Sequence, residues 1–340
     1  MHPTQGRTPV GVIALVLGWN GMRYALGIDG GGSKCDAVLV AETGAVAGWG
    51  RGGPTHVYYD SPEVVAASYR EAIASALAGV VAAECWAAGY LPEGRFREVF
   101  PATGEAVHYL VTNEVETAFA SAQGQWGLVV LSGTGSFVHS RRPDGRHLHW
   151  GGLGPVLNDY GSAYEIGLRG LRAAFASGWT ESRRTSLAAA LPRALGVADL
   201  RGVFRLVYVE NMGRRQIAAL ARAVDREAEA GDRVAVECVR QSARELAGLA
   251  ADQIGELGMR DLAIPVVPIG GVAQGSRIWW DEMRCRLAEA APEMRPVWPR
   301  VQPAEGAALL ALRQMGVDWE PGLVGRLVET GRAFRPSREG

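Results

Sequence analysis

Two glycine-rich turns, each directly after a short apolar run, constrain the fold of this chain more than any other feature. The run YALGID at residues 24–29 is followed by GGGS, and the run LVVL at residues 128–131 is followed by SGTGS. Each run predicts a buried strand, and each turn precedes two further short strand patterns. Because the turns lie about a hundred residues apart, the sequence predicts an internal duplication.

Strand and helix patterns alternate along much of the chain, as in an α/β layered protein. The length of 340 residues favours two domains. Strands are expected at residues 24–29, 37–41, 45–49, 84–90, 107–112, 128–131, 137–141, 146–150 and 264–269. Helices are expected at 63–81, from residue 113, and at 162–177, 182–191 (ended by Pro192), 214–230, 232–257, 276–290 and 305–315.

The composition is that of a folded protein, with 48% hydrophobic and 21% charged residues. Glycine, at 45 residues, is nearly twice as frequent as its usual share of about 7%. A net charge of −1 argues against nucleic acid as a partner. The cysteines lack the close spacing of a zinc site, and free thiols favour a reducing cytoplasm. They are Cys35, Cys85, Cys238 and Cys285.

Residues 1–21 precede the first expected strand and are interpreted as an N-terminal extension. The apolar stretch at residues 10–19 could also be the core of a signal peptide, but the flank before it carries only Arg7 and no clear cleavage site is present. This stretch is too short to span a bilayer, and no later segment reaches about 18 uninterrupted apolar residues. We therefore expect no membrane partner.

The first glycine turn has the chemistry of a phosphate site. Glycines let backbone N–H groups approach a phosphate, and they also permit the positive φ angles that point successive N–H groups inward. Asp29, at the end of the strand, could hold Mg²⁺ through water. Lys34, the only lysine of the chain, offers a charge for phosphoryl oxygens. A tight β-turn is the alternative, but the second turn in the equivalent place favours phosphate binding.

Three other motifs fail. The P-loop motif G-x-x-x-x-G-K-[ST] is not matched, because serine stands where its lysine belongs. Residues 48–53 match the dinucleotide pattern G-x-G-x-x-G, but no helix pattern follows at once. The G-x-S-x-G of a nucleophile elbow is absent from the sequence.

The runs GIDGGGSK, LSGTGS, GGLGPVLNDYGSAYEIG and IPVVPIGGV together resemble the BadF/BadG/BcrA/BcrD-type ATPase family, and within it the N-acetylglucosamine kinases. The motifs occur in the same order over residues 24–312. The resemblance implies an actin-like ATPase fold, in which two ribonuclease-H-like domains enclose a nucleotide cleft. It implies an N-terminal domain of residues 22–121 plus 303–330, and a C-terminal domain of residues 122–302 with a helical insertion.

The resemblance also implies ATP with Mg²⁺ and assigns the nucleotide contacts. Asp29 would serve the metal, the two glycine turns would hold the phosphates, and a third turn would lie at the adenosine. The implied ATP-binding residues are Gly30, Gly31, Gly32, Ser33, Lys34, Gly133, Thr134, Gly135, Ala218, Ala219, Gly270, Gly271 and Gly275.

The acceptor side departs from the family pattern. The family has an aspartate as general base where this chain has Glu114, which could instead be a first-turn acid favoured by the helix dipole. A family asparagine, a second asparagine and a tryptophan correspond to His56, Phe137 and Leu153. The implied sugar-binding residues are His56, Asn113, Glu114, Ser136, Phe137, Gly152, Leu153, Gly154 and Asp159. Asp159 could also serve only as a helix N-terminal acid.

The leading hypothesis is an ATP-dependent kinase for N-acetylglucosamine, glucosamine or a related sugar, and relatives of this kind imply a homodimer. The altered acceptor residues indicate either another sugar or weakened phosphorylation. The alternatives are an ATPase activator with an iron–sulfur cluster, for which Cys85 and Cys285 lack glycine-rich surroundings, and a nucleotide-gated regulator without turnover.

Two aromatic clusters have open interpretations. His139, His147 and His149 flank an expected hairpin turn and could bind zinc, although exposed hairpin histidines are commoner. Trp279 and Trp280 are interpreted as helix packing, with base stacking as the alternative.

Overall fold

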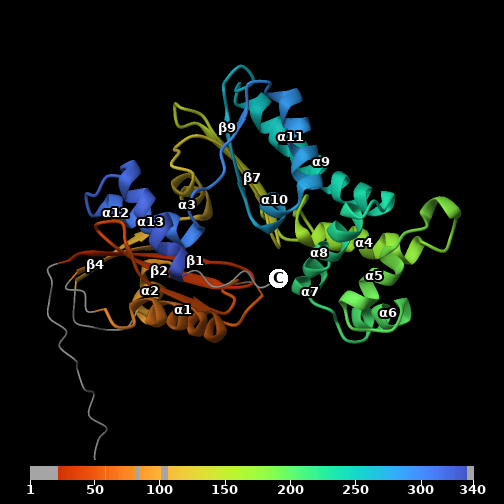
Figure 1. Cartoon of the computed structure of the whole chain (residues 1–340), viewed down its shortest axis with the longest axis horizontal. Coiled ribbons are helices and arrows are strands. Elements are labelled where there is room, and N and C mark those ends of the chain that lie inside the picture. The colour runs from red at the N-terminus through yellow and green to blue at the C-terminus, as the bar shows by residue number, and fades with distance from the viewer. Residues whose placement is uncertain (1–21, 58, 81–83, 101–105, 335–340) are drawn as a thin grey trace, which may run out of the picture.

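The computed structural model describes residues 22–57, 59–80, 84–100 and 106–334. The predicted extension at residues 1–21 lies outside this range. Two five-stranded sheets organise the chain (Figure 1). The first sheet contains β1 (Tyr24–Gly30), β2 (Cys35–Ala41), β3 (Val46–Gly52), β4 (Glu84–Gly89) and β5 (Ala106–Val111). The second contains β6 (Gly127–Ser132), β7 (Ser136–Arg141), β8 (His147–Gly151), β9 (Pro265–Ile269) and β10 (Arg295–Pro296).

The two sheets share one topology. The strand orders are β3-β2-β1-β4-β5 and β8-β7-β6-β9-β10. In each, an antiparallel three-stranded meander continues into two parallel strands. The duplication expected from the glycine turns is therefore present in the fold, and each turn joins the first strand of a sheet to the second.

Helices cover both faces of the first sheet (Figure 1). On one face, α1 (Pro62–Leu77) and α2 (Glu93–Val99) bury Leu26 and Ile28 of β1. On the other, α12 (Pro303–Gln314) and α13 (Pro321–Phe334) cover Ala25 and Val38. The backbone of α12 approaches β1 so closely that a Cβ on Gly27 would lie 2.0 Å from the carbonyl oxygen of Ala304.

The second sheet has helices of two kinds. One face carries α3 (Glu114–Ser121), which also packs on α12 and so lies between the two sheets. The other face carries the large helical core of the C-terminal half. Its helices are α4 (Ala163–Ala176), α5 (Leu187–Ala194), α6 (Leu200–Tyr208), α7 (Arg214–Ala219), α8 (Ala221–Glu229), α9 (Arg233–Glu256), α10 (Gly271–Gly275) and α11 (Arg277–Ala290), with a 3₁₀ turn at Glu181–Arg183.

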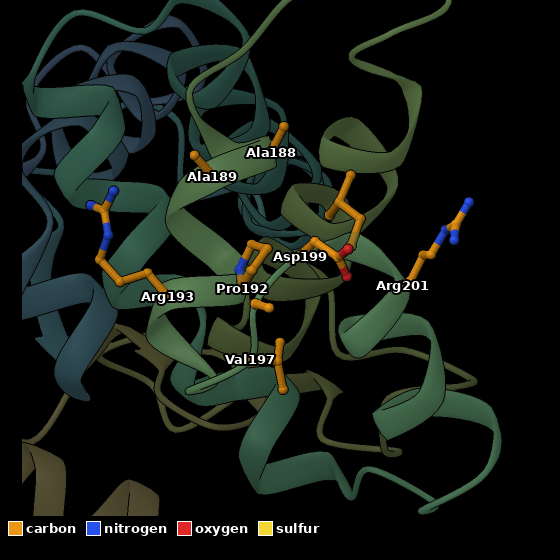
Figure 2. A pocket seen from close by; sticks show the side chains of 9 residues that line it. Ala188, Ala189, Pro192, Arg193, Val197, Asp199 and Arg201 are labelled. Atoms are coloured by element: carbon orange, nitrogen blue, oxygen red, sulfur yellow. The ribbon is translucent and has the colours of Figure 1, made fainter.

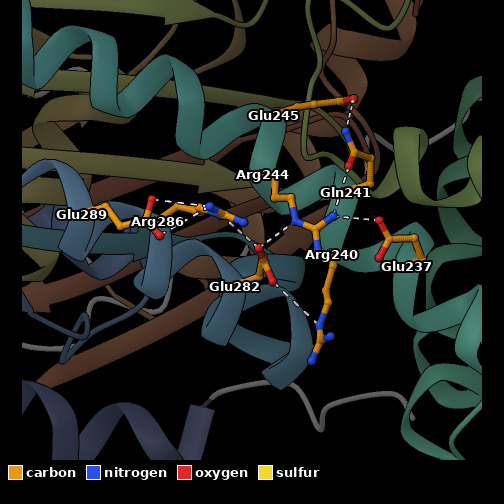
Figure 3. A network of polar contacts seen from close by, with 8 residues as sticks. All are labelled: Glu237, Arg240, Gln241, Arg244, Glu245, Glu282, Arg286 and Glu289. Carbon is orange, nitrogen blue, oxygen red and sulfur yellow. Dashed lines mark hydrogen bonds and ion pairs between the residues drawn. The ribbon is translucent and has the colours of Figure 1, made fainter.

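A charged network joins α9 to α11 on the outside of this core (Figure 3). Glu282 accepts from Arg244 at 2.8 Å and from Arg286 at 3.2 Å, and Arg240 approaches it at 3.8 Å. Arg244 also pairs with Glu237 at 2.7 Å. A network of this kind stabilises more than isolated surface pairs do, so it helps to fix α11 against the long helix.

Two expected helices differ from the structure. The helix expected at 182–191 begins only at Leu187, because the Asp232 carboxylate accepts from the backbone and side chain of Ser186. It also continues through Pro192, which lies inside its last turn. The helix expected at 214–230 is split at Leu220, whose N–H bonds to the carbonyl three residues back. The helices α2, α6 and α13 were not expected from sequence periodicity.

Among the described residues, no helix is both long and apolar enough to cross a membrane.

Candidate active site

The carboxyl ends of β1 and β4 and the first turns of α3 bring together a polar cluster. Tyr90, directly after β4, donates from Oη to Oδ1 of Asp29 at 2.8 Å. Its oxygen also lies 2.7 Å from Oγ1 of Thr117. Burial raises the pKa of Asp29, and the hydrogen bond from Tyr90 opposes that rise. The second oxygen of Asp29 takes no hydrogen bond from the described residues, so it fits a water-mediated Mg²⁺ ion.

Glu114 is the first residue of α3. The side-chain oxygen of Asn113 caps this helix, accepting from the N–H groups of Val115 and Glu116 at 3.0 Å each. The amide oxygen of Asn113 is therefore occupied by these two hydrogen bonds. Part of the Glu114 side chain is exposed to solvent, but the surrounding protein desolvates its carboxyl group. This desolvation, and after it the negative charge of Asp29, raises the pKa of Glu114 to about 7. Glu114 is thus a carboxylate able to exchange protons near neutral pH.

Lys34 is held beside the first turn by an ion pair. Its Nζ donates to Asp36, which Arg51 also approaches with Nε at 2.7 Å. Burial raises the pKa of Asp36, but hydrogen bonds from Arg51 and Lys34 outweigh that effect and keep the pKa below its usual range. The Lys34 side chain is 50% exposed and its ammonium carries two further N–H donors. It remains a predicted phosphate contact.

In the first turn, Gly30 is required by packing and not by an unusual backbone angle. The expectation of positive φ angles is wrong at Gly30, Gly31 and Gly32, because none of them is left-handed. A Cβ on Gly30 would lie 2.3 Å from Oη of Tyr69 and 2.6 Å from Oγ1 of Thr55. Gly32 has open space around it, as does the exposed Ser33, so this part of the turn is accessible.

The second turn is anchored from the C-terminal half. The carbonyl of Gly133 accepts from the N–H of Ala163 at 2.8 Å, and Ser132 donates to the carbonyl of Gly161 at 2.6 Å. Gly270 is left-handed, with φ of 93°, and a Cβ there would lie 2.4 Å from the carbonyl oxygen of Ser132. The predicted phosphate turn and the predicted adenosine turn are therefore neighbours.

Four of the remaining predicted nucleotide residues lie on short helices. Gly271 and Gly275 begin and end α10, while Ala218 and Ala219 end α7. Ala219 is exposed and Ala218 is buried. Thr134, in the second turn, is partly exposed.

On the acceptor side, Asp159 forms an ion pair that the sequence did not indicate. Arg214, at the start of α7, donates from Nη2 to Oδ2 of Asp159 at 2.6 Å. Gly135 lies against both groups, because a Cβ there would be 2.7 Å from Arg214 Nη2. Asp159 also accepts from the backbone N–H groups of Ser136 and Gly154. It is therefore tied to the second glycine turn, beyond any role as a helix N-terminal acid.

His56 belongs to a loop of the first domain that reaches the second. Its N–H donates to Asp60 at 3.1 Å, and its ring lies 4.6 Å from that of Tyr59. Burial, followed by the charge of Arg214, lowers the pKa of His56. Arg215 pairs with both oxygens of Asp60 at 2.7 Å. The structure thus brings His56 and Asp159, 103 positions apart in the chain, to the same place.

The other predicted acceptor residues differ in how much surface they offer. Leu153 is 64% exposed and lies between the left-handed Gly152 and Gly154. Phe137 is only 4% exposed and packs against the His149 ring, so it has little side-chain surface for a sugar. Ser136 is buried, and its hydroxyl donates to the carbonyl of Tyr160 at 2.5 Å. Phe137 and Ser136 therefore support the second glycine turn by packing and hydrogen bonding.

Of the two aromatic clusters, the tryptophans pack in the core and the histidines lie together on β7 and β8. Trp279 is fully buried and donates from Nε1 to the carbonyl of Gly161 at 3.1 Å, so the packing interpretation is correct. His139 is buried, with ring centroids 5.5 Å from His147 and 5.7 Å from His149. Across the described part of the chain, no three His, Cys, Asp or Glu side chains are grouped to hold a metal ion.

A groove of about 630 Å³ lies elsewhere, between α5 and α6 (Figure 2). It is lined by Ala188, Ala189, Pro192 and Val197, with Asp199 and Arg201 at its rim. Its lining holds a single carboxylate, Asp199, and none of the predicted site residues. The groove is therefore separate from the candidate active site, which lies at the glycine turns.

Sequence reasoning missed Tyr90 and Arg214. Tyr90 could have been found, because it directly follows β4, which pairs with β1 in parallel. The ends of parallel strands meet at one edge of the sheet, so this position indicates that Tyr90 lies near Asp29. Arg214 gave no signal, since arginine is abundant throughout this chain.

A model of the BadF/BadG/BcrA/BcrD ATPase family matches residues 26–311. The N-acetylmuramic acid/N-acetylglucosamine kinase of Clostridium acetobutylicum is 27% identical over 301 residues, covering 85% of this chain and 98% of that protein.

Solved structures extend the comparison to the fold. A protein of Chromobacterium violaceum, provisionally named an N-acetylglucosamine kinase, has 25% identity and a TM-score of 0.65, covering 85% of this chain and 99% of its own. A ROK family glucokinase of Streptomyces griseus, solved with glucose and AMPPNP, has 17% identity and a TM-score of 0.55, covering 86% and 98%. The predicted two-domain actin-like ATPase fold is confirmed.

Proposed function

The chain belongs to the BadF/BadG/BcrA/BcrD ATPase family, and we propose that it is an ATP-dependent kinase that phosphorylates a hydroxyl of an amino sugar. One observation carries the proposal. Glu114 is a carboxylate with a pKa of about 7, and the charge of Asp29, at the start of the first glycine turn, contributes to that value. A proton acceptor beside a phosphate-binding turn is the arrangement that phosphoryl transfer to an alcohol requires.

In the proposed reaction, Glu114 takes the proton of the acceptor hydroxyl as its oxygen attacks the γ-phosphorus of ATP. The new phosphorus–oxygen bond forms while the bond to the β,γ-bridging oxygen breaks, and ADP leaves with that oxygen. The two glycine turns hold the phosphates through backbone N–H groups, and Lys34 supplies a positive charge beside the first turn.

Mg²⁺, when bound with ATP, would neutralise charge on the β- and γ-phosphate oxygens. Asp29 would hold it through its free oxygen, while Tyr90 fixes the orientation of the carboxylate. Burial raises the pKa of Asp29 and so disfavours its charged form. A neighbouring cation would act in the opposite direction and favour the ionised carboxylate.

The names of the relatives support an amino sugar as the acceptor. The Clostridium relative is named for both N-acetylmuramic acid and N-acetylglucosamine. In this chain His56 and the exposed Leu153 replace the asparagine and tryptophan implied by the family resemblance. These replacements indicate either a sugar other than N-acetylglucosamine or weakened phosphorylation.

The test is a coupled assay of ADP release with Mg-ATP and a panel of N-acetylglucosamine, N-acetylmuramic acid, glucosamine and glucose. We expect ADP release that depends on an N-acetylated amino sugar and exceeds release with glucose by at least about tenfold, a difference of about 1.4 kcal/mol in transition-state binding. ATP binding without sugar-dependent ADP would contradict the kinase and favour a nucleotide-gated regulator.

The Asp29→Asn variant tests the metal role. It keeps an oxygen that can accept from Tyr90 but removes the charge. We expect the Mg²⁺ concentration for half-maximal activity to rise by about 10- to 100-fold, as for loss of an outer-shell ligand. Asp144→Asn, in the exposed hairpin turn, is the control. An unchanged Mg²⁺ dependence in Asp29→Asn would exclude the role.

A further inference from the structure

Arg214 lies where the second glycine turn meets the acceptor side. Its ion pair with Asp159 is nearly closed to solvent, the two side chains being 16% and 2% exposed. The guanidinium also touches the turn itself, since a Cβ on Gly135 would lie 2.7 Å from Nη2 and 3.2 Å from Oδ2 of Asp159. A bulkier residue at this turn would push the pair apart.

The same arginine reaches the other domain. Its guanidinium carbon lies 5.0 Å from the ring centroid of Tyr59, within the range of a cation–π contact. The next residue, Arg215, pairs with Asp60. The N-terminus of α7 therefore contacts the loop that carries His56.

Asp159 depends on its partners for its charge. Burial raises the pKa of this carboxyl, while Arg214 and the N–H groups of Ser136 and Gly154 oppose the rise. His56 also faces this cluster, since the charges of Arg214, Asp60 and Asp159 all act on it. A desolvated carboxylate that loses its cation takes up a proton more readily or turns toward water.

We propose that Arg214 is a positioning residue for the acceptor, which keeps the Asp159 carboxylate charged and fixed beside the second glycine turn. Ionised, Asp159 accepts a hydrogen bond from an acceptor hydroxyl with one of its oxygens. The proposal rests on the proposed function, because Asp159 has this task only where a hydroxylated acceptor binds. Arg214 touches neither reacting atom and acts through Asp159.

Steady-state kinetics of Arg214→Met provides the first test. We expect the KM for the best acceptor sugar to rise about 10- to 100-fold, the range for a lost hydrogen bond to a charged group, while the KM for ATP stays within about twofold. Arg214→Lys should recover much of the loss, since it keeps a cation beside Asp159. A fall in kcat at unchanged sugar KM would overturn the proposal, because it would place the guanidinium on the phosphoryl group instead.

Arg169→Met is the matched control. Arg169 also donates to a carboxylate, Glu245, at 2.6 Å, and the two side chains are 25% and 27% exposed, but it joins α4 to α9 away from the glycine turns. Arg169 also pairs with Glu165 at 2.9 Å, so this control loses two ion pairs, and we expect an unchanged sugar KM. An equal rise of sugar KM in both variants would mean a general loss of structure and would overturn the proposal.

Two further measurements need no turnover. Carbon-13 NMR of labelled aspartate, with Asp159→Asn for assignment, should show Asp159 titrating at higher pH in Arg214→Met than in the wild type. The acidic limb of sugar binding, followed by calorimetry, should move the same way. An unchanged Asp159 titration overturns the inference alone, whereas a wild type that neither binds nor phosphorylates any sugar overturns the proposed function.

Discussion

The Glu114→Gln variant is expected to phosphorylate its acceptor about 10²- to 10⁴-fold more slowly than the wild type, the usual contribution of a general base. Glutamine is nearly isosteric with glutamate, so the start of α3 and its Asn113 cap should persist. ATP affinity should stay within about twofold, because the first glycine turn is untouched. The measurements are kcat from ADP release and nucleotide affinity by calorimetry.

The pH profile gives this prediction a second readout. Glu114 acts as base only when deprotonated, and its pKa is raised to about 7. The wild-type kcat/KM should therefore be constant above that pH and should fall about tenfold per unit below it. The residual activity of Glu114→Gln should lack this limb. Turnover of Glu114→Gln within about tenfold of wild type would exclude Glu114 as the base.

Gly27→Ala is expected to cause a large loss of stability. The added Cβ would lie 2.0 Å from the carbonyl oxygen of Ala304 and 2.2 Å from the nitrogen of Ala308, both in the backbone of α12. A helix backbone cannot yield as a side-chain end can, so the helix must move away from β1. We expect the free energy of unfolding to fall by about 3 kcal/mol, at the upper end for overpacking.

The control for this substitution is Gly325→Ala in α13, where a new Cβ meets open space. There alanine should leave stability unchanged or raise it by about 0.5–1 kcal/mol, since glycine is unfavourable within a helix. Both variants are compared by the midpoint of urea unfolding. Equal midpoints for Gly27→Ala and wild type would show that α12 does not pack on β1 as described.

The sequence alone determined the parts of this protein that depend on local backbone chemistry. Apolar runs ending in glycine turns identified β1 and β6, and the repetition of that pattern identified the duplicated sheet. The start of α3 at Asn113 and Glu114 could be placed as well, because a cap residue and an acid after a strand form a local signal. The site role of Glu114 came from the family resemblance. Periods of two and 3.6 residues are visible over a few neighbouring positions, so such features need no knowledge of distant contacts.

The tertiary structure alone decided the partners and the charges of the site. Asp159 and Arg214 stand 55 positions apart, and Asp60 and Arg215 stand 155 apart, so no local pattern selects these arginines from the many others. The raised pKa of Glu114 likewise depends on burial and on Asp29, which another strand supplies. Electrostatic energy follows distance and solvent exposure in space, and neither quantity is encoded by spacing along the chain.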